Sequence, residues 1–220
     1  MNVRKRNLIA AVMNSVIVIA TALCLVTFFT KGGGGNMKNF GFGMFRYFTV
    51  DSNVFCAAAS LCLLPYQFAA SLNGKTRIPK WVQVFKFLGT VTVTLTMLVV
   101  IAFLLPMTKD LQGMYGGANF HMHLAGPLLA VFSFCFLEND NRLERSRRLL
   151  PLIPVAAYGL VYFIMVIGIG GSRGGWNDFY MFDQGGHWYI SVASIAIVTS
   201  LICLAEFALN QRRFRNVRRA

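Results

Sequence analysis

Six long apolar runs constrain this sequence more than any other feature. Each has about 17–25 residues and carries almost no charge, which is the length and composition that a helix needs to cross a bilayer. Because hydrocarbon offers no partner to backbone N–H and C=O groups, such runs form helices. The runs cover residues 7–30, 48–72, 84–105, 121–137, 149–169 and 188–209. The sequence therefore predicts an all-α fold, a polytopic membrane protein in which residues 1–220 form a single six-transmembrane-helix bundle.

The distribution of basic residues predicts the orientation of the bundle. If the N-terminus is inside, sixteen of the 21 lysines and arginines fall in the termini and loops on the inner side. The other five are Lys31, Lys38, Arg46, Lys109 and Arg173. Since inner loops of membrane proteins are enriched in bases, both termini are expected in the cytoplasm, an N-in/C-in topology. The net charge of +13 then reflects topology and anionic lipid headgroups near the basic tail after Leu209, and we expect no nucleic-acid partner.

Polar residues at the start of the second run form a first candidate site. Helical spacing puts Thr49, Ser52 and Asn53 on one face, while Asp51 points to another side. Their simplest role is structural, because hydroxyls at a helix start satisfy backbone carbonyls and an acid there interacts well with the helix dipole.

All three histidines are expected at the same outer level as this face. His121 and His123 open the fourth run, and His187 directly precedes the sixth. A hydroxyl beside a histidine forms a nucleophile–base pair, so Thr49 with His123 or His121 is a candidate pair that Asp51 would orient. The histidines equally suit hydrogen bonds to a loop at the interface.

The histidines also allow a metal site, and other polar residues lie within the spans. His121, His123 and His187 with an aspartate have the donor types of a zinc site, although helical positions two apart point in nearly opposite directions. The third run carries Thr90, Thr92, Thr94 and Thr96, which we expect to bond backward to their own helix or to pack; Glu206 is expected to snorkel or to pair with the basic tail. With no inverted repeat and no buried charge expected at midplane, little in the sequence indicates a transporter.

Three short motifs resemble one known family. Residues 46–53 (RYFTVDSN) resemble the start of the second span in bacterial six-span relatives of the androgen-induced and androgen-dependent TFPI-regulating proteins. His123 followed by Pro127 is similar to the head of that family's fourth span, and residues 175–182 (GWNDFYMF) resemble its aromatic loop before the last span.

The resemblance implies an activity and assigns residues to it. Animal members are regarded as membrane hydrolases of fatty acid esters of hydroxy fatty acids that use an intramembrane threonine and a histidine. The matching residues here are Thr49 as nucleophile and His123 as base. The family's two histidines lie three apart and here they lie two apart; His123 is the better match because Pro127 and an apolar run ending in Glu138 follow it.

The hypothesis that follows is an intramembrane hydrolase of a membrane lipid or fatty acid ester in the bacterial cytoplasmic membrane. It needs no cofactor and no metal, and Ser52, Asn53 or backbone amides of the glycine-rich loop are candidate donors to the oxyanion. The alternatives are a non-catalytic membrane protein, such as a small transporter or scaffold, and a metal-dependent lipid hydrolase that uses the three histidines.

Overall fold

The computed structural model describes residues 2–30, 41–74, 78–138, 143–183 and 185–212, and in these residues the fold is helical without a strand. Six helical segments of this described part are long and apolar enough to span a membrane. They are Val3–Thr30, Phe48–Asn73, Lys80–Thr108, Ala118–Leu137, Arg145–Ile169 and Trp188–Asn210. The prediction of an all-α six-helix bundle is confirmed, and the predicted runs differ from the observed spans by a few residues at their ends. The glycine-rich stretch 32–35 and the basic tail from residue 213 lie outside the described residues.

Several spans combine more than one type of helix. The elements that make up the spans are α1 (Val3–Thr30), α2 (Phe48–Asn73), α3 (Lys80–Val99) continuing into α4 (Leu105–Thr108), α6 (Ala118–Phe120) continuing into α7 (Gly126–Phe132), α8 (Leu152–Phe163) and α9 (Trp188–Asn210). Widened π-helical segments follow α3, α6, α7 and α8, at Val100–Leu104, His121–Ala125, Ser133–Leu137 and Ile164–Ile169. Short helices at the end of the bundle away from both termini, called the outer end after the predicted orientation, are the 3-10 turns Gly41–Arg46 and Gly171–Arg173 and the helix α5 (Leu111–Tyr115).

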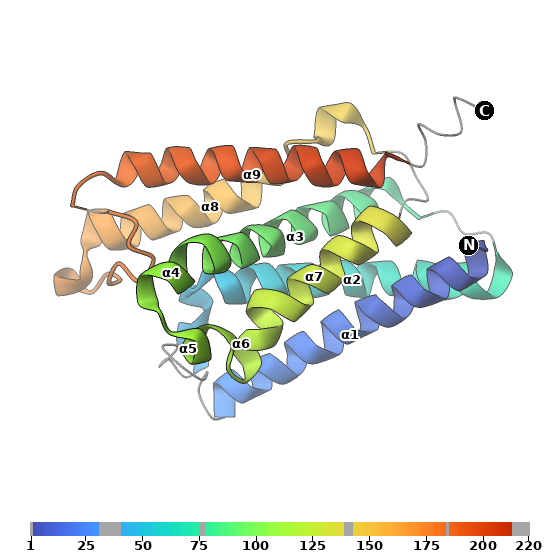
Figure 1. Ribbon diagram of the computed structural model, residues 1–220, viewed down its shortest axis with the longest axis horizontal. Coiled ribbons are helices and arrows are strands. Elements are labelled where there is room, and N and C mark those ends of the chain that lie inside the picture. Colours follow the sequence, from blue (N-terminus) through green and yellow to red (C-terminus); the bar gives the residue numbers. More distant parts are fainter. Residues whose placement is uncertain (1, 31–40, 75–77, 139–142, 184, 213–220) are drawn as a thin grey trace.

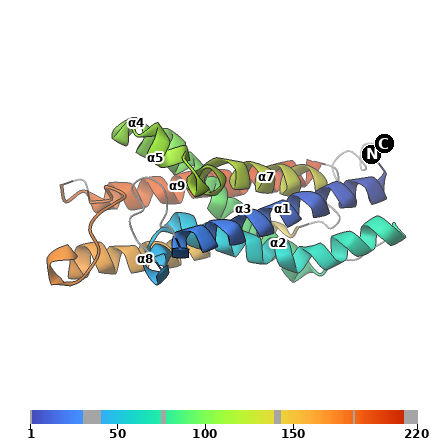
Figure 2. The ribbon, with the colours of Figure 1, turned by 90° about the horizontal axis from the view of Figure 1, so that it is seen from below.

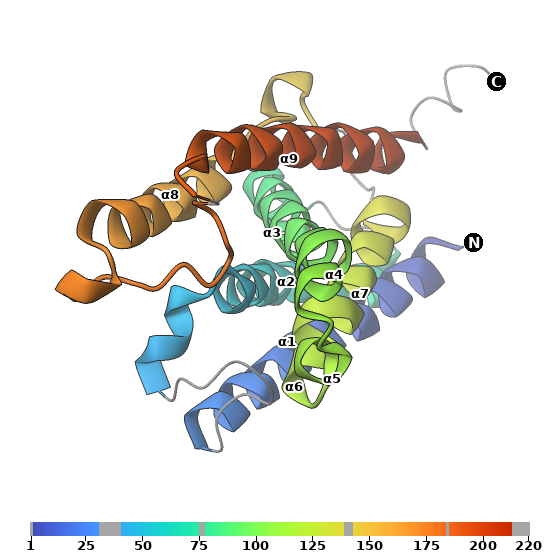
Figure 3. The ribbon, with the colours of Figure 1, turned by 60° about the vertical axis from the view of Figure 1, so that its left-hand side comes forward.

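The helix α3 lies at the centre of the bundle. Figure 3 shows α8 and α9 on one side of it and α1, α2 and α7 on the other. Among the six spans, the one formed by α3 is the most buried and the one formed by α8 the least. The start of α1 and the end of α9 lie at the same end of the bundle (Figures 1 and 2), as an even number of spans requires.

Two of the π-helical turns come directly before a proline. Leu105 precedes Pro106 and donates its N–H to the Val100 carbonyl, five residues back; Gly126 precedes Pro127 and donates to the His121 carbonyl in the same way. A proline has no N–H, and its ring clashes with the carbonyl four residues before it. Widening the preceding turn relieves this clash and leaves a carbonyl free for another partner.

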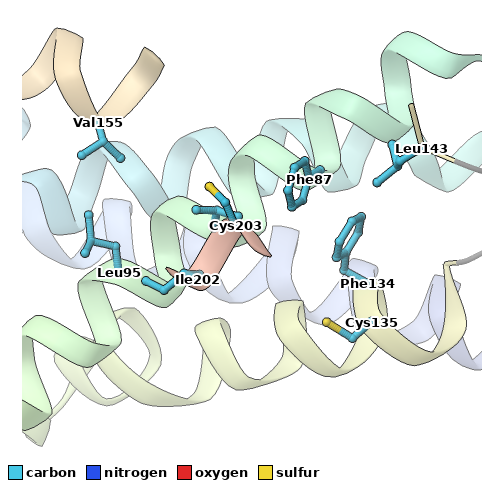
Figure 4. Close-up of a cluster of buried hydrophobic side chains, with 9 residues drawn as sticks. Phe87, Leu95, Phe134, Cys135, Leu143, Val155, Ile202 and Cys203 are labelled. Carbon is cyan, nitrogen blue, oxygen red and sulfur yellow. The ribbon is translucent and has the colours of Figure 1, made fainter. Parts of the chain in front are cut away.

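The apolar core joins α3 to the fourth and sixth spans. The ring of Phe87 stacks on Phe134 with centroids 5.4 Å apart and an interplanar angle of 17° (Figure 4). Leu95 on α3 and Ile202 and Cys203 on α9 complete the same buried cluster. Since lipid tails are as apolar as these side chains, close packing rather than water exclusion holds such helices together.

Close approach of two backbones fixes the pairing of α2 with α3. A Cβ built on Gly89 would lie 2.8 Å from the Cα of Cys56, a distance that real Cβ atoms do not reach. Gly89 therefore acts as the small residue that lets these helices touch, as small residues do at membrane helix interfaces.

Replacing Gly89 by alanine tests this contact. We expect Gly89→Ala to lower the free energy of unfolding by about 1–3 kcal/mol, because the added methyl forces the two backbones apart. The measurement is thermal unfolding of the purified protein in detergent. Gly159→Ala is the matched control, since nothing lies within 4 Å of its added Cβ and its stability should not fall. Equal melting temperatures for the two variants would contradict the contact.

Candidate functional site

The first turn of α2 is held from inside by its own polar side chains. Thr49, Ser52 and Asn53 are all buried, as their spacing predicts. The Ser52 hydroxyl lies 3.2 Å from the Thr49 carbonyl and 2.9 Å from the Thr96 hydroxyl on α3. Ser52 thus has the structural role of linking α2 to α3. Asp51, in the same turn, is half-buried and has no hydrogen bond to a histidine within the described chain.

Asn53 links α2 to the fourth span. Its side-chain amide donates to the Thr49 carbonyl at 2.8 Å and to the Met122 carbonyl at 2.9 Å. Met122 lies in the π-helical turn before Pro127. In such a turn its carbonyl would accept from the residue five positions further along, but that residue is Pro127, which has no N–H, and the neighbouring Gly126 N–H bonds to the His121 carbonyl. The freed Met122 carbonyl is therefore satisfied by Asn53, and the segment that carries Thr49 is held beside the residue that precedes His123. Because both N–H groups of this amide are used, Asn53 has none left for an oxyanion.

The two neighbouring histidines point to different partners. His121 Nε2 lies 3.2 Å from the Thr21 hydroxyl on α1, whereas His123 Nδ1 lies 2.6 Å from the Met114 carbonyl on α5. A carbonyl only accepts, so Nδ1 of His123 carries the proton and its Nε2 is left as an acceptor. This is the tautomer that a general base needs, and the Met114 carbonyl orients the ring in place of Asp51. No hydrogen bond joins His123 to Thr49 in the described residues.

His187 lies away from the other two histidines. It is exposed at the start of α9, with its ring 5.9 Å from that of Tyr189. Among the residues that the structure describes, no three side chains of His, Cys, Asp or Glu are grouped to hold a metal ion. The proposed zinc set of three histidines is therefore not assembled in this part of the chain.

Two tyrosines that sequence reasoning missed lie beside Thr49. Tyr180, Tyr158 and Thr49 line the same cavity, and the Tyr180 phenol interacts with Thr49, Phe48 and Tyr158. Burial raises the pKa of Tyr180 to about 12, although the interactions with Thr49, Tyr158 and Phe48 act in the opposite direction. Tyr180 therefore stays protonated at neutral pH. The Tyr158 hydroxyl also donates to the Arg46 carbonyl at 2.7 Å.

The aromatic loop before α9 places Tyr180 in this position. The buried Tyr162 hydroxyl on α8 donates to Asp178 Oδ1 at 2.9 Å and accepts from the Tyr180 N–H at 3.1 Å. Asp178 in turn accepts from the N–H groups of Phe182 and Asp183, at 2.7 and 2.8 Å. These bonds fold the loop back against α8, so the motif GWNDFYMF is built to deliver Tyr180 to the start of α2. In the sequence these tyrosines look like the aromatic residues common at membrane interfaces. The only signal that Tyr180 contacts Thr49 was its place in the motif, directly after Asp178 and Phe179.

An apolar cavity of about 530 Å³ starts at Thr49. Seven lining residues have a polar side-chain group: Thr49, Thr96, Tyr158, Tyr162, Tyr180, Ser191 and Ser194. The other lining residues come mainly from α3, α8 and α9 and are apolar. The lining residues Ile190 and Val198 are also exposed on α9, so the cavity reaches the lipid-facing surface. His123 is not among the lining residues.

A second polar centre, at the inner end of the bundle, contradicts two sequence predictions. Lys86 is not a loop residue: it lies in the second turn of α3, is wholly buried, and donates to Asn14 Oδ1 and Ser60 Oγ at 2.7 Å each. Glu206 is buried too and lies 2.6 Å from the Thr94 hydroxyl, so the expected snorkelling is wrong. The sequence was expected to place no buried charge at the midplane; Lys86 and Glu206 are buried nearer the inner ends of their spans.

Glu138 completes this inner centre. Its Oε1 accepts from Asn14, Gln67 and Ser133, and it is as buried as the other two ionisable residues. Lys86 was counted among the loop bases because a charged residue at the third position of an apolar run resembles the charged residues that flank such runs. The signal was present in the spacing, since Lys86, Thr90 and Thr94 follow each other at i, i+4 and i+8 on one face of α3.

The back-bonding predicted for the four threonines of α3 is confirmed. Each hydroxyl donates to a carbonyl three or four residues before it, at distances between 2.8 and 3.2 Å. All four are buried because α3 is surrounded by other helices.

Comparison with protein-family models, curated proteins and solved structures finds no match to this chain.

The Asn53 link gives a prediction for stability. We expect Asn53→Leu to lower the free energy of unfolding by about 1–3 kcal/mol, because the buried Met122 carbonyl loses its only side-chain donor in the described structure. Thermal unfolding in detergent measures the effect. Ser71→Ala is the control: its exposed hydroxyl bonds only within its own helix, and its removal should change little. A melting temperature for Asn53→Leu within error of the control would contradict the link.

Proposed function

We propose that this protein is an intramembrane hydrolase of lipid or fatty acid esters, with Thr49 as nucleophile and His123 as general base. The observation that carries the proposal is the position of Thr49, a buried hydroxyl that lines an apolar cavity large enough for an acyl chain. The resemblance of the motifs around Thr49, His123 and Tyr180 to a family of such hydrolases agrees with it.

The chemistry begins with the Thr49 hydroxyl. A threonine is a weak nucleophile unless a base takes its proton during the attack. The tautomer of His123, fixed by the Met114 carbonyl, leaves Nε2 as that base. The two groups have no direct hydrogen bond in the described structure, and catalytic hydrogen bonds commonly tighten only when substrate is bound. Attack on the ester carbonyl gives a tetrahedral oxyanion; its collapse releases the alcohol and leaves an acyl-threonine, which water then hydrolyses with His123 again as base.

The oxyanion has suitable donors at the start of α2. The protonated Tyr180 phenol lies beside Thr49, and the N-terminal end of a helix carries a partial positive charge. A tyrosine whose pKa is about 12 donates a hydrogen bond throughout the neutral range. Tyr180 thus takes the role that sequence reasoning gave to Ser52 or Asn53.

A non-catalytic role is the alternative class. The buried centre of Lys86, Glu138 and Glu206 is the observation that favours it, because ionisable residues within spans commonly serve transport. Wild-type protein that cleaves no lipid ester would support this class.

The nucleophile and base are tested with purified protein and a panel of lipid esters. We expect Thr49→Ala to reduce cleavage to background and His123→Ala to do nearly the same, while His121→Ala has a milder effect because His121 bonds to Thr21 on α1. Thr49→Ser, which keeps the hydroxyl, should retain activity. Melting temperatures near that of wild type are required of each variant. Cleavage that survives Thr49→Ala would contradict the proposed nucleophile.

The cavity makes a separate prediction about chain length. Gly159 lines the cavity and has open space at its Cβ, so Gly159→Phe should fill part of the volume. We expect cleavage of long-chain esters to fall by about tenfold or more while short-chain esters are little affected, since one or two kcal/mol of lost acyl binding has this size. Leu160→Phe, on the exposed side of the same helix, is the control. Equal losses for short and long chains would place the acyl chain elsewhere.

A further inference from the structure

The three ionisable residues at the inner end of the bundle are not equivalent. They are Lys86 on α3, Glu138 at the end of the fourth span and Glu206 on α9, and all are buried. Lys86 has one positive formal charge and the two glutamates have two negative ones; Arg6 on α1 is another buried cation of the described residues. In a medium of low dielectric constant, a buried negative charge is costly unless a cation or proton neutralises it.

Glu138 is the carboxylate that balances Lys86. Asn14 connects them, because its Oδ1 accepts from the Lys86 ammonium while its Nδ2 donates to Glu138 Oε1 at 2.5 Å. Gln67 and Ser133 donate to the same oxygen. Hydrogen bonds from several donors favour the ionised form of a carboxyl group. Lys86 and Glu138 are therefore joined through the Asn14 amide, whereas Glu206 is the acid of the three that the described hydrogen bonds do not join to Lys86 in this way.

Glu206 has a hydrogen-bond pattern that an ionised carboxylate does not satisfy. Its Oε1 lies 2.6 Å from the Thr94 hydroxyl, and its Oε2, like that of Glu138, is buried with no hydrogen-bond partner in the described structure; unlike Glu138, it has only this one hydrogen bond there. The Thr94 hydroxyl also lies 2.9 Å from the Thr90 carbonyl, which only accepts. A hydroxyl has a single hydrogen. If Thr94 donates it to Thr90, as the other threonines of α3 donate to their own helix, the hydrogen between Thr94 and Glu206 has to come from the carboxyl group.

Polar side chains lie between Glu206 and the inner end of α9, along a short path for a proton. Glu206 lies one turn before Asn210, which is buried and donates to the carbonyls of Phe134 and Glu138. Gln211 donates in turn to Asn210 at the end of α9. The distance along the helix from Glu206 to Asn210 is about 6 Å at the rise of an α-helix.

We propose that Glu206 is a proton-binding site of the bundle, which holds one exchangeable proton through a hydrogen bond to Thr94 and exchanges it with the inner side past Asn210. Binding forms the O–H bond of the carboxylic acid and neutralises its charge; release returns the proton to water and leaves the carboxylate. Glu206 is not a lining residue of the cavity that contains Thr49, and the proposal does not depend on the hydrolase proposal. The titratable or charged residues near Glu206 are Lys86 on α3, Glu138 and Cys135 in the fourth span, Cys56 on α2, Cys203 on α9 itself and Arg212 beyond its end.

Infrared spectroscopy of the full-length protein in lipid bilayers tests the site. At neutral pH we expect a carbonyl stretching band of a protonated carboxylic acid that shifts in deuterated water and disappears when the pH is raised. Glu206→Gln should remove this band, whereas Glu144→Gln should keep it, because Glu144 is ion-paired to Lys80 and Arg147 at the surface. A wild-type protein without the band, or a Glu206→Gln variant that retains it at full intensity, would overturn the proposal.

A second variant keeps the test decisive if Glu206→Gln does not fold. Thr94→Val preserves the shape of the side chain and leaves the acid in place, but it removes the acceptor for its proton. We expect the carboxylic acid band to persist at a higher frequency, since a weaker hydrogen bond stiffens the carbonyl. A band at the wild-type frequency would show that the proton does not lie between Glu206 and Thr94 and would overturn the assigned site.

Discussion

The Lys86 ammonium organises the inner half of the bundle because the surrounding hydrocarbon offers it no partner. Every donor and acceptor near it comes from a different span: Asn14 from α1, Ser60 from α2, and Glu138 through Asn14 from the fourth span. Loss of any one leaves a buried polar group unsatisfied, which costs about 1–3 kcal/mol or more when a charge is involved. The arrangement of these three spans around α3 is therefore tied to the placement of one side chain.

The two ends of the bundle carry different chemistry. At the outer end, hydroxyl and phenol groups line an apolar cavity, and the Asp178 carboxyl group holds the loop that carries Tyr180. At the inner end, the polar groups are ionisable and are joined into one network without a cavity of comparable size in the described residues. The proposed ester site and the proposed proton site thus use different kinds of polar group.

The fold was predictable from the sequence to a large extent, because length, hydropathy and the distribution of bases act locally. The face of Thr49, Ser52 and Asn53 was predictable for the same reason, since helical spacing determines it. The partners of these residues were not predictable. Asn53 bonds to the Met122 carbonyl because Pro127, five residues further along, has no N–H to donate to it, and hydropathy does not record such a change. Tyr180 reaches Thr49 only through the fold of its loop around Tyr162. Lys86 was misplaced because a base near the end of a run looks like its flank whether it is in water or in the core.

Because the cavity opens onto the lipid-facing surface of α9, the concentration that governs binding is that of the ligand in the membrane, not in water. A molecule that enters between helices is drawn from the two-dimensional solution of the membrane, where its mole fraction among the other lipids determines occupancy. Its solubility in water has no direct effect. Abundant bilayer lipids therefore compete with any specific ligand at all times, and selectivity has to come from the polar groups that line the cavity, because every acyl chain fits the apolar walls about equally well.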